Sequence, residues 1–256
     1  MRALISDIHA NLEALEAVLA DIRKHPVDDI LFLGDLVGYG PEPEACTDLV
    51  MKHCKVGVKG NHDFALINGP YGFNYIAAEA IQCQRKTMLP QCLILCGKKK
   101  TRWDYLDHLP YDRTEGGALF IHGSPLDPIA DYVFCKKSPA LWDEKKISEI
   151  FQMFGEIMFC GHTHHPCVIY DDLSCDLPAD IGYSADLSRA RKAIVNIGSV
   201  GQPRDLDTRA CYVLWDPDKN TVTWRRVQYD YEATAKKIEK IGCIDNRCGE
   251  RLKVGK

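Results

Sequence analysis

The chain has 256 residues, of which 46% are hydrophobic and 27% are charged, and its formal net charge is −4. This composition is ordinary for a globular protein, and the mild negative charge gives no electrostatic footprint for non-specific nucleic-acid binding. No apolar run approaches the ~20 residues of a membrane span. The length is ample for an α/β domain with a buried core, and we expect residues 1–256 to form a single domain.

The first sixty residues alternate between short apolar runs and helical patterns. Asn11 is placed to cap the first helix, and Pro41 and Pro43 mark the beginning of the second. The expected strands are 2–5, 29–33 and 54–59, and the expected helices are 11–24 and 41–53. This β-α-β-α-β order is typical of a parallel sheet.

After the first sixty residues the regular alternation of strand and helix ends. The expected helices are 74–88, 91–109, 138–154 and 230–241, and strands end at Ile121 and at Cys160. Four short runs separated by turns indicate a largely antiparallel second sheet, and they cover 166–170, 193–197, 210–215 and 222–229. We therefore predict an α/β fold of mixed α+β type, built as a four-layer αββα sandwich of two facing β-sheets flanked by helices.

Five short polar motifs each follow an apolar strand-like run. They are Asp7-Ile8-His9, Gly34-Asp35, Gly60-Asn61-His62-Asp63, His122-Gly123 and Gly161-His162-Thr163-His164. Because the ends of successive strands meet at one edge of an α/β sheet, these side chains should converge there. Oxygen and imidazole donors without thiolate suit Mn, Fe, Mg or Zn acting on phosphate-like substrates. The order of the motifs predicts a dinuclear metal centre.

The pattern D-x-H, G-D, G-N-H-D, H, G-H-x-H resembles that of the calcineurin-like metallophosphoesterases. The segment 196–204 is similar to a stretch found in the small prokaryotic phosphodiesterase-like branch. The resemblance implies an αββα sandwich that binds two divalent metal ions, Mn foremost, with Fe, Zn, Ni and Mg as alternatives. It implies that Asp35 bridges the ions. It assigns Asp7, His9 and His164 to one ion, and Asn61, His122 and His162 to the other.

The resemblance also implies a mechanism of phosphoester hydrolysis. A hydroxide that bridges the two metals attacks phosphorus, and His62 donates a hydrogen bond to the phosphate or a proton to the leaving group. Asp63 is expected to orient His62 and to favour its protonated form, so both are candidate catalytic residues. Asn61, His62 and Arg204 are the candidate substrate-binding residues, although Arg204 is equally suited to a surface salt bridge. His165 is expected at the rim of the site.

The second motif favours a diester substrate. Protein phosphatases of this superfamily read G-D-x-x-D-R-G there, whereas residues 34–40 lack both the second Asp and the Arg that binds a terminal phosphate through two oxygens. We therefore predict a phosphodiesterase acting on a small phosphodiester or nucleotide. The alternatives are a phosphomonoesterase acting on phosphoprotein or diadenosine polyphosphate, and a catalytically weak metal-binding scaffold. Tyr39, Tyr71, Phe73 and Trp142 are candidate rim aromatics that could stack on a base.

Twelve cysteines are present, and none forms a C-x-x-C pair. Several lie in apolar strand-like runs, where a free Cys packs as a small hydrophobic residue. Cleavage of an N-terminal signal would remove Asp7 and His9, so we expect the protein to stay in the cytoplasm. In that reducing compartment all twelve thiols are expected to be free.

Overall fold

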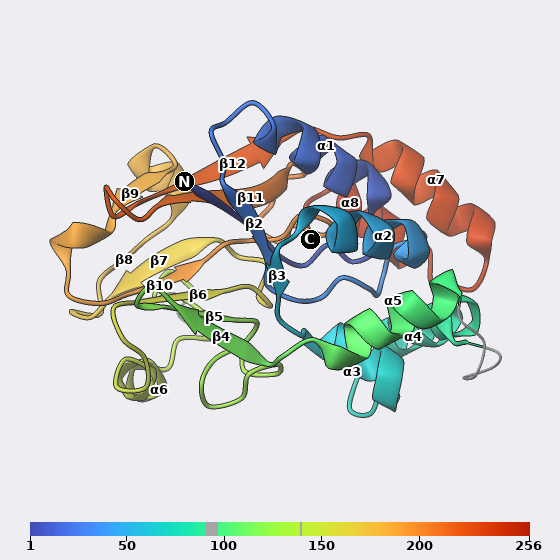
Figure 1. The fold of residues 1–256 in the computed structure, drawn as a ribbon, viewed down its shortest axis with the longest axis horizontal. Helices are drawn as coiled ribbons and strands as arrows, with labels where there is room; N and C mark the ends of the chain where they lie inside the picture. Colours follow the sequence, from blue (N-terminus) through green and yellow to red (C-terminus); the bar gives the residue numbers. More distant parts are fainter. Residues whose placement is uncertain (91–96, 139) are drawn as a thin grey trace.

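The computed structural model describes residues 1–90, 97–138 and 140–256, which form two facing six-stranded sheets (Figure 1). The strand order of the first sheet is β3-β2-β1-β11-β12-β9, and that of the second is β4-β5-β6-β10-β7-β8. The first sheet comprises β1 (Arg2–Ile5), β2 (Asp29–Phe32), β3 (Val56–Gly57), β9 (Ser184–Asp186), β11 (Ala210–Asp216) and β12 (Thr221–Val227). The second comprises β4 (Asp112–Glu115), β5 (Ala118–Ile121), β6 (Ile157–Cys160), β7 (Cys167–Tyr170), β8 (Cys175–Asp176) and β10 (Ala193–Asn196).

Both sheets are mixed. β1, β2 and β3 are parallel to one another, and β5, β6 and β10 form the parallel part of the second sheet. The prediction that the late strands make up a second sheet of their own is wrong. β11 pairs with β1, and Ala3 lies opposite Leu214, while β10 pairs with β6. An apolar pattern records which face of a strand is buried, but it does not record which strand lies beside it.

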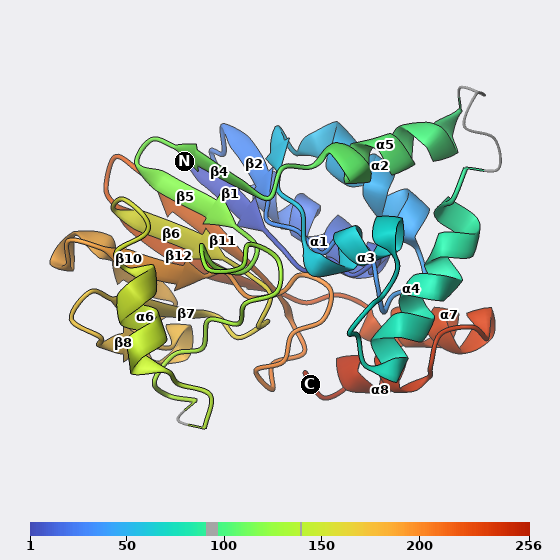
Figure 2. The same cartoon turned by 90° about the horizontal axis from the view of Figure 1, so that it is seen from below.

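Helices cover the outer faces of the sheets and extend beyond one end of the sandwich (Figure 2). The first sheet is covered by α1 (Leu12–Ile22) and α2 (Pro43–His53), and the second by α6 (Glu144–Ile150). Five helices lie toward the far end, namely α3 (Asn61–Asn68), α4 (Tyr75–Met88), α5 (Lys98–His108), α7 (Tyr231–Ile241) and α8 (Arg247–Leu252). Two short 3-10 helices cover Pro178–Ile181 and Leu187–Arg189. No helix in the described ranges is long and apolar enough to cross a bilayer.

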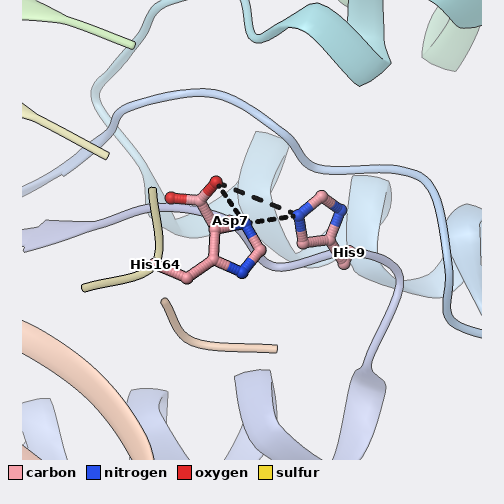
Figure 3. A group of neighbouring side chains, drawn as sticks. All are labelled: Asp7, His9 and His164. Carbon is pink, nitrogen blue, oxygen red and sulfur yellow. Dashed lines mark hydrogen bonds and ion pairs between the residues drawn. The ribbon is translucent and has the colours of Figure 1, made fainter. Parts of the chain in front are cut away.

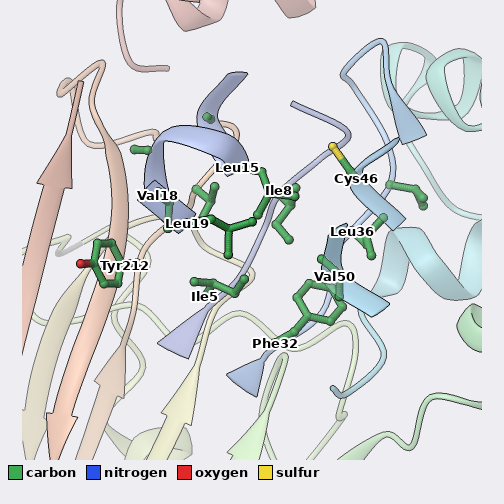
Figure 4. Packing of buried hydrophobic residues seen from close by; sticks show 14 of the residues in the cluster. Ile5, Ile8, Leu15, Val18, Leu19, Phe32, Leu36, Cys46, Val50 and Tyr212 are labelled. Carbon is green, nitrogen blue, oxygen red and sulfur yellow. The ribbon is translucent and has the colours of Figure 1, made fainter. Parts of the chain in front are cut away.

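The core confirms the four layers. Alternate residues of β1 point to opposite faces, so that Ile5 packs against α1 and α2 (Figure 4) while Leu4 packs between the sheets. Between the sheets, the rings of Phe120 and Phe159 are stacked with centroids 5.5 Å apart, and Trp215 packs against both. A third buried cluster separates the second sheet from α6.

Most helix predictions hold, with boundary errors. Asn11 and Asn74 cap α1 and α4 through side-chain oxygens that accept backbone N–H groups. The helix expected at 138–154 is shorter than predicted. It is α6, which begins at Glu144, after the Asp143 side chain that caps it. α3, α8 and β4 were not predicted. The helix expected at 91–109 is α5, and its first residues, 91–96, lie outside the described residues.

The prediction that all twelve cysteines are free is wrong. Cys83 of α4 and Cys243, just after α7, form a disulfide that joins segments 160 residues apart. The two Cα atoms are 5.7 Å apart because the chain returns α7 to the side of the molecule that carries α4. Eight other cysteines in the described ranges are free, and most of them are buried.

Candidate metal centre

The structure brings all seven predicted ligands to one edge of the two sheets. Each lies just beyond the carboxyl end of a strand: Asp7 and His9 after β1, Asp35 after β2, Asn61 after β3, His122 after β5, and His162 and His164 after β6. Six of them are buried and Asn61 is half-buried. The site therefore takes residues from both sheets of the sandwich.

Asp7, His9 and His164 form the first group (Figure 3). The Asp7 Oδ1 lies 3.1 Å from the His164 Nε2 and 3.9 Å from the His9 Nε2. The two Nε2 atoms are 3.1 Å apart. Side chains that offer one oxygen and two imidazole nitrogens at this spacing can share one cation.

The second group consists of Asp35, His122 and His162, with Asn61 beside it. The His122 Nε2 lies 3.1 Å from the His162 Nδ1, 3.3 Å from the Asn61 Oδ1 and 3.4 Å from the Asp35 Oδ2. The same Oδ2 of Asp35 lies 3.7 Å from the His9 Nε2 of the first group. One carboxylate oxygen thus faces both groups, which is the position expected of a bridging ligand.

The outer nitrogen of each histidine fixes its tautomer. The Nδ1 atoms of His9, His122 and His164 lie 2.9, 2.8 and 2.5 Å from the carbonyl oxygens of Val37, Leu33 and Gln202. The Nε2 of His162 lies 3.2 Å from the carbonyl oxygen of Ala130. A carbonyl can only accept, so these nitrogens carry the protons, and in the neutral rings the inner nitrogens present lone pairs.

Those lone pairs give a test of whether the residues fit a cation. In the first group the inner nitrogens of His9 and His164 face each other at 3.1 Å, and the buried Asp7 Oδ1 has no hydrogen-bond partner. Buried acceptors that face only one another are costly unless a positive charge lies between them. Burial lowers the pKa of His162 to about 3, whereas at His122 the carboxylates of Asp35 and Asp7 outweigh burial and raise the pKa to about 9. A site whose carboxylates attract a proton so strongly also attracts a metal cation, and the donor set fits one.

The backbone at the site is held in an uncommon conformation. Positive φ angles occur at five of the seven predicted ligands, namely Asp7 (54°), His9 (48°), Asp35 (59°), His162 (65°) and His164 (60°). Non-glycine residues in the left-handed region cost about 1–3 kcal/mol each, and they cluster where function requires them. At Gly34, an added Cβ would lie 2.8 Å from the His122 Nδ1, so the turn before Asp35 requires glycine.

Comparisons with known proteins agree with this site. Residues 2–166, more than half of the chain, match the model of the calcineurin-like phosphoesterases. The chain belongs to this family. The uncharacterized protein MJ0912 of Methanocaldococcus jannaschii is 34% identical over 263 aligned residues, which cover 100% of this chain and 98% of the relative.

Solved structures share the fold of this calcineurin-like phosphoesterase. The crystal structure of a metallophosphoesterase from Sphaerobacter thermophilus matches with a TM-score of 0.81 and 36% identity, covering 100% of this chain and 98% of that one. The hypothetical protein PH1004 from Pyrococcus horikoshii OT3 matches with a TM-score of 0.75 and 17% identity, covering 100% and 99%. The family prediction made from the motifs is confirmed.

The structure corrects the expected partnership of His62 and Asp63. The Asp63 carboxylate accepts four backbone N–H groups, those of Asp35, Leu36, Val37 and Gly60, at 2.9–3.3 Å. The Nδ1 of His62 is buried against Gly38 and has no hydrogen-bond partner. Asp63 therefore holds the turn that carries Asp35, and it does not orient the His62 ring.

His62 also differs from expectation in its charge. The ring packs at 4.7–4.9 Å against the rings of His9, Tyr39 and Phe73. Burial among these groups lowers the pKa of His62 to about 3, so the imidazole of this phosphoesterase is neutral at pH 7 without substrate. A possible ligand atom of His62 lies close enough to those of His9 and Asp35 to share a cation with them. That His62 does not bind a metal therefore remains a prediction.

Arg204 lies close to the site, but it is not the surface ion pair that was considered. Its Nε and a terminal nitrogen donate to the Gln202 Oε1 at 3.2 and 2.7 Å, and its guanidinium lies 5.7 Å from the centre of the Tyr39 ring. No carboxylate pairs with Arg204 among the residues that the structure describes. Gln202 thus links Arg204 to the predicted ligand His164, whose ring contacts the Gln202 carbonyl.

The 196–204 segment supports the first motif. Ser199 donates its hydroxyl to the Asp7 carbonyl at 2.9 Å, and the Asn196 amide donates to the Gly161 carbonyl at 2.7 Å. His165 is half-buried, and its Nδ1 lies 2.9 Å from the Thr163 carbonyl, as expected for a rim residue. The segment therefore joins two of the ligand-bearing turns.

The aromatic candidates divide into two sets. Tyr39, Tyr71 and Phe73 line a pocket beside the metal centre, whereas Trp142 packs against the cluster under α6 and takes no part. Sequence analysis missed Tyr132, whose ring stacks on His162 with centroids 4.0 Å apart. The available signal was its place in the loop that follows His122, because loops at this edge of a sheet carry binding residues.

Gln84 of α4 was also missed. Its side-chain oxygen accepts the Gly38 N–H at 2.6 Å and its amide donates to the Gly40 carbonyl at 2.7 Å. The loop that packs against His62 is thereby fixed to a helix that carries no motif. A single buried Gln in a helix gives no sequence signal of such a role.

Proposed function

We propose that this calcineurin-like phosphoesterase is a phosphodiesterase that hydrolyses a small phosphodiester or nucleotide with two divalent cations. The observation that carries the proposal is the pair of histidine contacts at 3.1 Å, one in each group, with the Asp35 Oδ2 facing both groups. Asp7, His9 and His164 would hold one ion, Asn61, His122 and His162 the other, and Asp35 both. Mn is the first choice, with Fe, Zn, Ni and Mg as alternatives.

When bound, the cations would supply Lewis acidity and would lower the pKa of a water molecule toward neutrality. In the reaction, the water oxygen forms a bond to phosphorus, the ester P–O bond breaks, and the departing alkoxide takes up a proton. We assign His62, protonated once the anionic substrate is bound, as the donor of this proton, which leaves a neutral imidazole. Because the Nδ1 of His62 is buried against Gly38, its Nε2 is assigned as the donating nitrogen. Asn61 and Arg204 would bind the phosphoryl oxygens.

Asp63 acts in this scheme as a positioning residue. By accepting the N–H groups of Asp35 and Gly60, it fixes the turn before His62 and the turn that carries the bridging carboxylate. The Asp35 Oδ1 in turn accepts the His62 N–H at 2.8 Å. Asp63 thus sets the relative position of Asp35 and His62 through the backbone.

A diester is favoured because the second motif lacks the Arg that would bind the extra charge of a monoester. One observation supports the alternative of a phosphomonoesterase. Arg204 is near His62 and has no carboxylate partner among the described residues, so it can add positive charge for a terminal phosphate. The third alternative, a weakly catalytic scaffold, is disfavoured by the presence of the complete set of site residues.

Matched chromogenic mono- and diesters, assayed with each metal and after chelation, test the proposal. The diester should be the better substrate, and chelation should abolish its turnover. His62→Ala should lower turnover of a poor leaving group by about 10²- to 10⁴-fold, with a smaller loss for p-nitrophenolate. The control is His108→Ala, which alters an exposed histidine of α5.

Elemental analysis of the His62→Ala protein separates catalysis from metal binding. Retention of both ions with the expected loss supports the assigned role. Loss of an ion with the mutation would make His62 a ligand, and equal losses on both leaving groups would refute its role at the departing oxygen. A monoester preference that disappears in Arg204→Ala would replace the diesterase by the monoesterase.

A further inference from the structure

A pocket of about 440 Å³ opens directly beside the metal centre. Asn61, His62 and His162 form the part of its lining that belongs to the site. Five aromatic rings contribute to the rest, and no Lys, Arg, Asp or Glu occurs among the described residues that line it. Pockets of a few hundred Å³ with mainly apolar and aromatic walls bind small organic groups.

Tyr132 forms one wall of the pocket and is firmly positioned. Its ring is nearly parallel to that of His162, at an angle of 21°, and 44% of its surface is exposed. Lys146 holds the loop by donating to the Tyr132 carbonyl at 2.6 Å and to the Asp131 carboxylate at 3.0 Å. Ser124 donates to the same carboxylate. The exposed aromatic face is thus presented on a loop that is held by two half-buried polar contacts and one exposed one.

Tyr71 and Phe73 line the pocket from the turn between α3 and α4. Phe73 meets the His62 ring edge-on with centroids 4.9 Å apart. Tyr71 is 86% exposed, the most exposed of the large hydrophobic side chains in the described part of the chain. Gly69 and Gly72 flank it with φ angles of 105° and 79°, a backbone that projects the ring outward. Tyr71 and Phe73 thus add aromatic surface to a pocket that adjoins the site, and such walls are typical of ligand pockets.

We propose that this pocket binds the leaving group of the substrate and that the leaving group is a nucleoside, with its base stacked on Tyr132 and Tyr71. The inference rests on the proposed function, since His62, which would act on the departing oxygen, is part of the same lining. A base is planar, uncharged and stacks on aromatic rings. A further phosphate or a phosphopeptide rich in charge would find no charged partner in these walls, and a bare polyol would leave the aromatic faces unused.

Two diesters with the same type of linkage test the proposal with the metal-loaded protein. One is a dinucleoside monophosphate and the other is glycerophosphoglycerol, and hydrolysis is followed by phosphorus NMR. In Tyr71→Ala and Tyr132→Leu, the ratio of kcat/KM for the nucleoside diester to that for the glycerol diester should fall at least about fivefold, the lower end of measured base stacking on aromatic rings. The fall should come mainly from KM.

Tyr75→Ala is the matched control, because Tyr75 is 68% exposed, lies four residues beyond Tyr71 and does not line the pocket. Its ratio should equal that of the wild type. An unchanged ratio in both pocket variants would overturn the inference. If Tyr132→Leu loses metal through its contact with His162, Tyr71→Ala, which is far more exposed, decides the outcome.

Calorimetric binding of adenosine and uridine separates this inference from the proposed function. Binding that weakens at least about fivefold in Tyr71→Ala supports the pocket even if the wild type hydrolyses neither diester, and only the proposed function then fails. Hydrolysis of both diesters without any nucleoside preference or nucleoside binding would refute the pocket and leave the diesterase intact.

Discussion

Substitution of Asp63 by Ala should destabilise the protein, because it removes the carboxylate that accepts hydrogen bonds from four buried backbone N–H groups. The carboxylate is fully buried, and it accepts the N–H groups of Asp35 and Gly60 on one oxygen and of Leu36 and Val37 on the other. An unsatisfied buried donor costs about 1–3 kcal/mol. Four donors at the low end of that range give about 4 kcal/mol, and the low end applies because water can enter the space that the side chain leaves.

Part of this cost is offset by the burial of the carboxylate itself. Burial and the nearby charge of Asp35 raise the pKa of Asp63 to about 7, which shows that the folded protein does not hold the charge without penalty. Removing a charge that is expensive to bury regains some free energy, so we expect a net loss of about 3–4 kcal/mol. Urea unfolding followed by circular dichroism at pH 8 measures it, with a chelator present because bound metal would stabilise the folded state.

Asp107→Ala is the matched control, since Asp107 is an exposed aspartate of α5 and should change stability by less than about 0.5 kcal/mol. Activity gives an independent test through a double-mutant cycle with His62→Ala. If Asp63 works through the backbone turns, its substitution lowers activity in the His62→Ala background as well. A stable Asp63→Ala protein, whose activity loss vanishes when His62 is absent, would refute the backbone role and restore the orienting one.

Three further outcomes are expected. Asp35→Asn should lower metal content and turnover more than Asp7→Asn, because the Asp35 Oδ2 faces both groups, and a fully chelated protein that kept its rate would contradict the proposed metal mechanism. Burial would raise the pKa of Asp21, but its hydrogen bonds, chiefly from Tyr212, outweigh burial and lower the pKa. Asp21→Asn should therefore lower the free energy of unfolding near pH 7, and its difference from the wild type should disappear as the pH falls below about 4 and the wild-type carboxylate is protonated. Peptide mapping of unreduced protein should find Cys83 joined to Cys243, and recovery of both as alkylated thiols would disprove the bond.

The sequence predicted the convergence of the candidate ligands better than it predicted the sheets. The ligand motifs are local, and each lies at the end of its own strand, so we could expect the seven side chains to converge without knowing how the strands pair. Strand pairing depends on contacts that no local pattern records. β11 therefore joins β1, about two hundred residues earlier in the chain, and the disulfide between Cys83 and Cys243 escaped prediction for the same reason.

The roles of residues beside the ligands were the hardest to predict. His62 and Asp63 lie beside the candidate ligands, but their adjacency in the chain suggested a side-chain contact that the helix does not allow. α3 begins at Asn61, so successive side chains point in different directions, and Asp63 points back to the start of the helix to accept the Gly60 N–H. Gln84 makes its two hydrogen bonds from a helix without any motif, so only the tertiary structure reveals its role. The signal for Tyr132 was only its place in the loop after His122.

The strained backbone of the ligands links the stability of the fold to its chemistry. Positive φ angles at five of the predicted ligands cost about 1–3 kcal/mol each. In the metal-free protein the side chains of these residues do not offset this cost, because the lone pairs of His9 and His164 face one another. The surrounding structure must therefore hold them, and the contacts that do so are identifiable: the Asp63 carboxylate at the Asp35 turn and the Ser199 hydroxyl on the Asp7 carbonyl. A cation held between these donors would relieve the repulsion between their lone pairs. A scaffold that holds the donors together in advance would favour metal binding, so we expect mutations at Asp63 or Ser199 to weaken it, although neither residue is among the seven predicted ligands.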